Sequence, residues 1–210
     1  MKYRYLGKSE LDVGPLVSFL KDTLVPLYED PVYRTMLHSL RTSESRKKGY
    51  PPVWLDRNWQ PEKDQSLKHS RHFWCLPLQN DFFVIGGLLL DLKFPTVFGY
   101  QNRSSWSNRL KDYLVKPQIL ISNQPSTIHV DTDRKCAVNT FLYNTDNSVT
   151  EYYDGENVIE SFTYTEGDTF LIDTETPHRV NQPTETTRLV LSWGYNIPFE
   201  QAVEILNDTK

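Results

Sequence analysis

The 210-residue chain has little of what several classes of protein need. It has only two cysteines, Cys75 and Cys136, and no cysteine pair at metal-binding spacing, so neither a disulfide framework nor a structural zinc site is expected. Its 23 basic and 27 acidic residues give a net charge of −4. This balance argues against a nucleic-acid partner that is held by bulk charge. The basic stretch 41–48 is short and is interrupted by Glu44, so we interpret it as a solvated loop.

Long hydrophobic runs are also missing. The longest apolar stretch, Phe82 to Leu90, is too short to span a bilayer, and the charged N-terminal residues MKYRYLGKSE do not have the pattern of a secretory signal. We therefore expect a cytoplasmic protein without a membrane partner. The composition does not indicate the oligomeric state.

Aromatic residues, at 13% of the chain, supply enough large apolar side chains for a globular core. The length favours a single domain over residues 1–210, with a helical and loop part at 1–70, a β core at 71–195 and a C-terminal segment at 196–210. Apolar residues recur at helical spacing from Leu16 to Tyr28, with Asp12 as an expected N-cap. Pro26 is expected to kink or split this helix, and Asp30-Pro31 to start a second helix. A surface loop is expected at 41–68.

Beyond residue 70 the pattern is typical of β-strands. A helix is expected at 104–115, closed by Pro117, and a last helix at 198–206. Good turn formers separate the remaining segments. The expected strands are 72–78, 82–90, 119–122, 127–130, 136–144, 150–154, 158–164, 168–173, 178–182 and 188–195. The last eight of these, short and closely spaced, predict a sandwich or jelly roll.

Three residues in the β region are suited to binding one metal ion. His129 and Asp131 are two apart, so on a strand both side chains point to the same side, and His178 could join them from a neighbouring strand. Two imidazoles and one carboxylate leave open coordination positions on a non-haem Fe(II). An isolated His-x-Asp triplet is common by chance, and a histidine after proline is often only a turn residue.

Four further residues are candidates for holding ligands near this site. Arg188 begins the run RLVLSW and could hold a carboxylate in a bidentate contact, with Ser192 on the same strand face. The alternative for Arg188 is a surface pair with Glu185. Asn139 and Tyr143 share a face of their strand and could reach the metal pocket, although core packing and cross-strand bonds would also explain Tyr143.

Arg134 is a candidate for binding the carboxylate of a substrate or co-substrate. The alternative is a solvated loop arginine beside Asp133.

The order H-V-D, a strand at 137–144, a Gly-Asp turn, P-H-R-V and R-L-V-L-S-W resembles the 2-oxoglutarate/Fe(II)-dependent oxygenase superfamily over residues 118–195. The resemblance implies a mainly β fold: a double-stranded β-helix (jelly roll, cupin-like) with flanking N-terminal helices and a short C-terminal helix. It also implies Fe(II) as cofactor, 2-oxoglutarate as co-substrate and dioxygen as oxidant. The matching metal ligands are His129, Asp131 and His178, and Arg188 matches the anchor of the far 2-oxoglutarate carboxylate.

A weaker resemblance concerns the aspartyl/asparaginyl β-hydroxylase-like branch, which includes free-proline hydroxylases. It is carried by residues 5–12 (YLGKSELD) and 73–78 (FWCLPL). The stretch 33–67 has no counterpart there. The branch tends to carry an arginine and a histidine after the first ligands, whereas here Arg134 is followed by Lys135 and Cys136.

The expected function is therefore a dioxygenase that hydroxylates an amino acid, a peptide side chain or a small metabolite and forms succinate and CO2. Two alternatives remain from the residues. One is a non-catalytic cupin-like protein that binds a metal or small molecule, and the other is a jelly-roll structural module.

Overall fold

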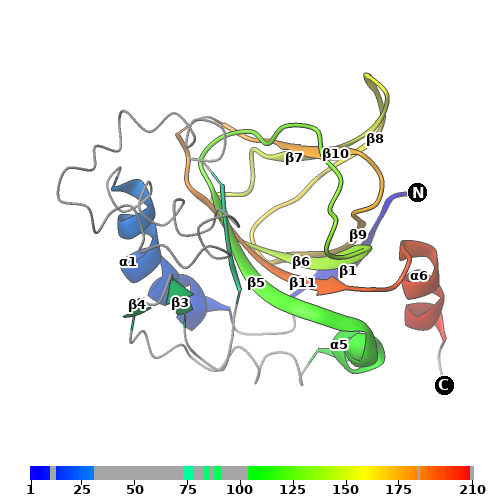
Figure 1. The fold of residues 1–210 in the computed structure, drawn as a ribbon, viewed down its shortest axis with the longest axis horizontal. Coiled ribbons are helices and arrows are strands. Elements are labelled where there is room, and N and C mark those ends of the chain that lie inside the picture. Colours follow the sequence, from blue (N-terminus) through cyan, green and yellow to red (C-terminus); the bar gives the residue numbers. More distant parts are fainter. Residues whose placement is uncertain are drawn as a thin grey trace, which may run out of the picture.

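The computed structural model describes residues 1–9, 13–30, 73–77, 83–85, 88–90, 104–183 and 185–208. Most of its strands form two antiparallel sheets that lie face to face, with the smaller sheet above the larger one in Figure 1. The larger sheet has the order β1 (Tyr3–Lys8), β9 (Asp168–Asp173), β6 (Cys136–Tyr143), β11 (Arg188–Tyr195), β5 (Leu114–Ser122) and β2 (Phe73–Pro77). The smaller sheet has the order β10 (His178–Asn181), β7 (Val149–Asp154) and β8 (Asn157–Thr163).

The chain passes repeatedly from one sheet to the other. After β5 it makes one isolated bridge, His129 to His178, on the side of the smaller sheet, and then returns to the larger sheet as β6. Strands β7 and β8 belong to the smaller sheet, β9 to the larger, β10 to the smaller and β11 to the larger. This winding is a double-stranded β-helix, so the expected jelly roll is confirmed.

Strict alternation along the strands produces two separate cores. In β11, Leu189 and Leu191 belong to a cluster on the outer face of the larger sheet, whereas Val190 belongs to the cluster between the two sheets. Helix side chains such as Leu20 and Ala202 pack into the outer cluster. Because β11 is buried on both faces, it reads as an almost continuous apolar run.

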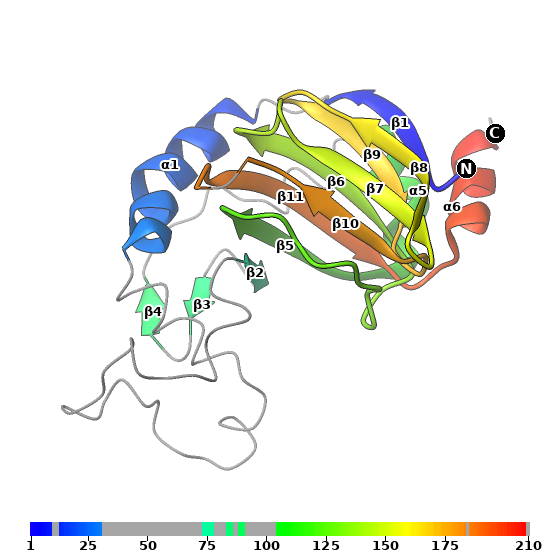
Figure 2. The same ribbon diagram turned by 90° about the horizontal axis from the view of Figure 1, so that it is seen from above.

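Four helical segments accompany the sheets: α1 (Gly14–Glu29), α5 (Ser105–Leu110), the short 3-10 helix η4 (Lys111–Tyr113) and α6 (Phe199–Asn207). Figure 2 shows α1 and α6 at opposite ends of the sheets. Of the two effects expected of Pro26, a kink or a split, the split does not occur, because α1 continues through Pro26 to Glu29. Asp12, the expected second helix at 31–40 and the loop at 41–68 lie outside the described residues.

Some boundaries also differ from the sequence predictions. The helix expected at 104–115 ends early, and β5 begins at Leu114 and contains Pro117. Pro117 lies opposite Trp193 of β11, and the described pairing of β5 with β2 ends one residue away, at Gln118 and Pro77. The stretch 82–90 contains a two-stranded pair, β3 (Phe83–Ile85) and β4 (Leu88–Leu90), and the strand expected at 127–130 is reduced to the bridge at His129.

Among the described segments, no helix combines the length and the apolar character needed to cross a membrane.

Candidate metal centre

The structure brings His129, Asp131 and His178 together. One potential ligand atom from each residue lies within 4.8 Å of the others. The two histidines form a closely spaced antiparallel pair, in which each amide donates to the other's carbonyl at 3.0 and 2.9 Å. Directly opposed residues present their side chains on the same face, which explains why the two rings lie only 4.6 Å apart.

Asp131 is two residues further along and shares this face. Its amide donates to the Thr174 carbonyl at 2.9 Å, which fixes the backbone at this point. Its Oδ1 lies 3.9 Å from His129 Nε2. Three separate ligand groups thus converge on one point, as a small divalent cation requires.

Both histidines are held in the tautomer that suits metal binding. His129 Nδ1 lies 2.8 Å from the Thr127 carbonyl, and His178 Nδ1 lies 2.8 Å from the Thr176 carbonyl. A carbonyl oxygen can only accept, so each Nδ1 carries a proton, and in the neutral ring the free lone pair then lies on Nε2. The same arrangement at both rings leaves both Nε2 atoms available as ligands.

His178 is buried, and its charge state follows from that. Burial is the main cause that lowers the pKa of this imidazole, and the nearby His129 lowers it further, whereas the bond to the Thr176 carbonyl and the charge of Asp131 act in the opposite direction. The neutral ring, which is the form that binds metals, is therefore favoured near neutral pH. His129 is different, with 41% of its side chain exposed, so the centre opens to solvent on the His129 side.

The turn before His178 is organised by Asp173. Its Oδ1 accepts the backbone amide of Glu175 at 2.9 Å, and its Oδ2 accepts the Thr176 hydroxyl at 2.6 Å and Lys2 Nζ at 3.0 Å. Burial tends to raise the pKa of this carboxyl, but the bonds from Thr176, Lys2 and Glu175 outweigh it and hold the pKa below the usual range. The charged carboxylate thus shapes the loop whose carbonyl orients His178.

Arg134 is joined to the metal centre itself. Its Nε donates to Asp131 Oδ2 at 2.6 Å, and its Nη1 donates to Ser192 Oγ at 2.8 Å. Only 8% of the Arg134 side chain is exposed. The structure therefore does not place Arg134 as a solvated loop residue, and it brings Ser192 to Arg134 rather than to Arg188.

Arg188 is a buried cation on the inner face of β11. It is 3% exposed, and its Nη1 donates to the Tyr164 hydroxyl at 2.7 Å, while its Nε has no hydrogen-bond partner. No carboxylate among the described residues forms an ion pair with it, Glu185 included. A buried guanidinium without a counter-charge is costly, and an anionic ligand would relieve that cost.

A row of uncharged polar side chains crosses three neighbouring strands of the larger sheet, on the face that also carries Arg188. Ser192 on β11 is paired with Asn139 on β6 and with Gln118 on β5. By alternation all three face the space between the sheets, and all are buried. Asn139 Oδ1 and Gln118 Oε1 have no hydrogen-bond partner. We call Gln118, Ser192 and Asn139 the polar row.

Tyr143 is not brought to this cluster. Its ring packs against the outer core and lies 4.6 Å from Lys21 Nζ on α1. The expectation that it shares a face with Asn139 fails because the pairing of β6 with β11 shifts register between Leu189 and Val190, next to Tyr143.

Sequence reasoning did not single out Tyr164, Gln118 or Asp173. Tyr164 stacks on Phe141, with ring centroids 3.4 Å apart, and lies just past the end of β8. Gln118 lies one residue before the expected strand at 119–122. Asp173 had a usable signal, because the sequence Asp-Thr-Glu-Thr is suited to a side-chain-capped turn.

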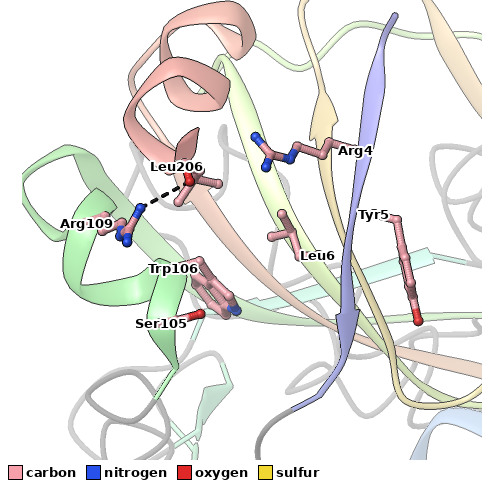
Figure 3. Close-up of a pocket in the computed structure, with 7 residues that line it drawn as sticks. All are labelled: Arg4, Tyr5, Leu6, Ser105, Trp106, Arg109 and Leu206. Carbon is pink, nitrogen blue, oxygen red and sulfur yellow. Dashed lines mark hydrogen bonds between the residues drawn. The ribbon is translucent and has the colours of Figure 1, made fainter. Parts of the chain in front are cut away.

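A separate pocket lies on the outer side of the molecule, between β1, α5 and α6, with a volume of about 220 Å³ (Figure 3). It contains none of the residues discussed above. Arg4 donates to the Val203 carbonyl, and Arg109 donates to the Leu206 and Asp208 carbonyls. Both arginines therefore donate hydrogen bonds to carbonyl oxygens at the C-terminal end of α6, so their role in this pocket is structural.

No protein-family model matches the chain, and no curated protein sequence matches it. Among solved structures it is similar to an oxidoreductase of the 2OG-Fe(II) oxygenase family from Burkholderia pseudomallei, with 16% identity and a TM-score of 0.35 over 40% of this chain and 43% of that one. It is also similar to SnoK, a non-heme alpha ketoglutarate dependent carbocyclase from nogalamycin biosynthesis, with 12% identity and a TM-score of 0.38 over 49% and 59% of the two chains. A cupin domain from Bordetella pertussis matches with 15% identity and a TM-score of 0.32 over 40% and 83%.

The matched part spans less than half of the Burkholderia protein and less than two thirds of SnoK. Because all three TM-scores are below 0.4, the functional assignment depends on this chain's own residues. By its winding the chain is a double-stranded β-helix protein, and it resembles both 2-oxoglutarate/Fe(II) oxygenases and cupins.

Proposed function

We propose that the protein is an Fe(II)- and 2-oxoglutarate-dependent dioxygenase that hydroxylates an amino acid, a peptide side chain or a small metabolite. The observation that carries this proposal is the convergence of His129, Asp131 and His178, with their ligand atoms within 4.8 Å of one another at the rim of the β-helix. Two imidazoles and one carboxylate on one side of a metal leave the opposite side free for a chelating co-substrate and dioxygen.

The buried charge of Arg188 supports 2-oxoglutarate as the co-substrate. Its guanidinium is directed into the space between the sheets, and its one side-chain hydrogen bond among the described residues goes to the Tyr164 hydroxyl. A dicarboxylate that chelates the metal with its oxo-acid end would present its other carboxylate to Arg188 and supply the missing counter-charge. Tyr164 would hold the guanidinium in position for this contact.

The bound iron and 2-oxoglutarate would supply an oxidant strong enough to attack a C–H bond, with release of succinate and CO2. The residues of the chain would bind and orient these groups. His129, Asp131 and His178 hold the metal, and the two threonine carbonyls keep the rings in the correct tautomer. The buried walls around His178 and Arg188 exclude water, so the substrate would approach from the solvent-exposed His129 side.

The first test is spectroscopic. Under anaerobic conditions, Fe(II) plus 2-oxoglutarate should produce a weak visible charge-transfer band in the wild-type protein, and His178→Ala should lose it. Admission of dioxygen should then release succinate even without a substrate. Wild-type protein that gives neither the band nor succinate would rule the proposal out and leave a structural module.

A second variant separates catalysis from binding. Asp131→Ala should abolish succinate release while circular dichroism and thermal unfolding show an intact fold, because Asp131 lies at the rim and not in either core cluster. A wild-type protein that shows the band but forms no succinate would instead be a cupin-like binding protein. Loss of the fold in Asp131→Ala would indicate a structural residue.

A further inference from the structure

Arg134 spans two parts of the metal centre. Through Nε it binds the carboxylate of Asp131, on the loop that precedes β6, and through Nη1 it binds Ser192 on β11. The side chain is almost completely buried, and the Arg134 carbonyl accepts the Thr174 hydroxyl at 3.1 Å. Both ends of the residue are therefore fixed.

Because of this contact, the two carboxylate oxygens of Asp131 have different partners. Oδ2 accepts the short bond from Arg134, whereas Oδ1 is the oxygen near His129 Nε2. A metal bound by the triad would accordingly meet Oδ1 alone. A carboxylate that is free to turn can use both oxygens and then occupies a second coordination position, which a chelating co-substrate would need.

We propose that Arg134 is a positioning residue that restricts Asp131 to one-oxygen coordination and thereby keeps a coordination position open for 2-oxoglutarate. This inference rests on the proposed function. It replaces the sequence-based expectation that Arg134 binds a substrate carboxylate, since two of its donors already have protein partners.

Arginine is suited to this role for geometric reasons. Its planar fork holds Nε and Nη1 in a fixed relation, so one side chain bonds Asp131 and Ser192 at the same time and in a set orientation. A lysine has a single nitrogen on a flexible stem and would not fix the carboxylate plane in this way. Ser192 forms the middle of the polar row, so Arg134 also ties the metal loop to the strand that carries Arg188.

The charge of Arg134 would also favour the binding of 2-oxoglutarate. The pair Asp131–Arg134 is neutral overall, so the carboxylate offsets less of the positive charge of a bound divalent ion. Because no described carboxylate forms an ion pair with Arg188 further inside, the centre would attract a doubly negative ligand.

The test compares two binding constants, using Mn(II) as the metal probe. Binding of Mn(II) alone is followed by the loss of the free-ion EPR signal, and binding of 2-oxoglutarate to the Mn(II)-loaded protein is followed by calorimetry. In Arg134→Gln we expect 2-oxoglutarate binding to weaken about 10- to 100-fold, while Mn(II) binding in its absence changes by less than about 3-fold. Arg134→Lys should recover little of the loss.

Arg179→Gln is the matched control. Arg179 follows His178 directly and forms an Nε ion pair with Glu151 at 2.7 Å, similar in geometry to the Arg134–Asp131 pair, but Glu151 is not part of the triad. This variant should leave both binding constants unchanged. If Arg134→Gln does not fold, Ser192→Ala replaces it, with an expected 3- to 10-fold loss confined to 2-oxoglutarate.

Equal affinities for 2-oxoglutarate in the wild type and Arg134→Gln would overturn the inference. So would an equal loss of Mn(II) and 2-oxoglutarate binding, because that is the result of a purely structural support. Wild-type protein that binds Mn(II) but no 2-oxoglutarate would instead refute the proposed function, and the role of Arg134 with it.

Discussion

Arg188 is the buried residue that the proposed co-substrate would contact. Its Nε has no partner, and the Tyr164 hydroxyl is the only hydrogen-bond acceptor that it has among the described residues. We expect Arg188→Met to weaken 2-oxoglutarate binding by about 10- to 100-fold, because charge-assisted hydrogen bonds are worth about 1.5–3 kcal/mol. The ligand-free protein should become more stable, since a buried charge without a counter-charge is removed.

Calorimetry of the Mn(II)-loaded protein and urea unfolding of the ligand-free protein measure the two effects. Arg188→Lys is the control, because it keeps the charge but loses the fork, and it should fall between the wild type and Arg188→Met. If Arg188→Met binds 2-oxoglutarate as the wild type does, Arg188 does not belong to the site.

Asn139 poses a similar conflict between stability and ligand binding. Its buried Oδ1 is unpartnered, and an unsatisfied polar group costs about 1–3 kcal/mol. Asn139→Leu, with a side chain of the same branching and number of non-hydrogen atoms, should therefore raise the free energy of unfolding by about 1 kcal/mol and weaken ligand binding. Urea unfolding checks the first effect, and a fall in stability would show that Asn139 already has a partner in solution.

The histidine and carboxylate candidates could be predicted from the sequence, because each follows from the spacing of nearby residues. Alternation places His129 and Asp131 on one side, and it places Arg188, Val190 and Ser192 on one face of β11. The partners of these residues were not accessible. Arg134 meets Ser192 across 58 positions and Lys2 meets Asp173 across 171, and no local pattern encodes such contacts.

The turn between β9 and β10 is a small element on which the orientation of His178 depends. Asp173→Asn keeps the shape of the side chain but removes the charge that Lys2 and Thr176 bind. We expect a loss of about 1–2 kcal/mol in the free energy of unfolding and weaker Mn(II) binding, since the Thr176 carbonyl would lose its fixed position. Asp154→Asn, at the exposed end of β7, is the control and should change neither quantity.

The same variant has a defined pH dependence. Because the folded-state pKa of Asp173 lies below the ordinary value of 3.8, its contribution is present above that pH and is lost as the pH falls through the lowered value. The stability difference between the wild type and Asp173→Asn should therefore shrink on acidification below about pH 4. A constant difference down to pH 2 would contradict the assigned role.

Strand β6 begins with a buried thiol, Cys136, whose pKa burial raises from 9.0 to about 12, with the nearby Asp173 adding to the rise. In a Cys75→Ala background, Cys136 should not react with a thiol reagent at pH 8 until the protein is denatured. Above pH 9 the unfolded chain ionises first, so stability should fall with pH by up to about 1.4 kcal/mol per unit until about pH 12. Chemical unfolding of Cys136→Ala should show a smaller alkaline loss, and an identical loss would exclude this thiol as a cause.

Element boundaries were predictable where periodicity and burial agree, as in β6, β9 and β11. They failed at Leu114 to Pro117, where a helical pattern and a proline suggested the end of a helix but neighbouring strands impose β structure. Strand β1 was not predicted at all. Its residues are partly buried and polar, and only pairing with β9 makes them a strand.

For the molecule as a whole, a metal that binds only the folded state must stabilise it. At a free Mn(II) concentration about 100 times the dissociation constant, the wild type should gain about 2.7 kcal/mol in the free energy of unfolding. The gain should vanish in Asp131→Ala. Thermal unfolding with and without Mn(II) measures it, and a gain that persists in Asp131→Ala would place the ion elsewhere.

The overall winding was predictable from the number and spacing of the strands, since eight short strands of this kind have few ways to bury their faces. The division into two cores could not be predicted from the sequence, because it depends on which helices cover the outer face of the larger sheet.

The pairing of the first strand has a practical consequence. The Lys2 carbonyl accepts the Asp173 amide at 2.8 Å and the Lys2 ammonium binds the Asp173 carboxylate, while the Met1 ammonium lies 3.7 Å from Glu160. A shortened fragment that began at α1 would still contain every proposed metal ligand. It would lack β1 and the contacts of Lys2 with Asp173, which support the turn before His178. Residues 1–8 thus support the proposed metal centre through their contacts with Asp173, although they contain none of its proposed ligands.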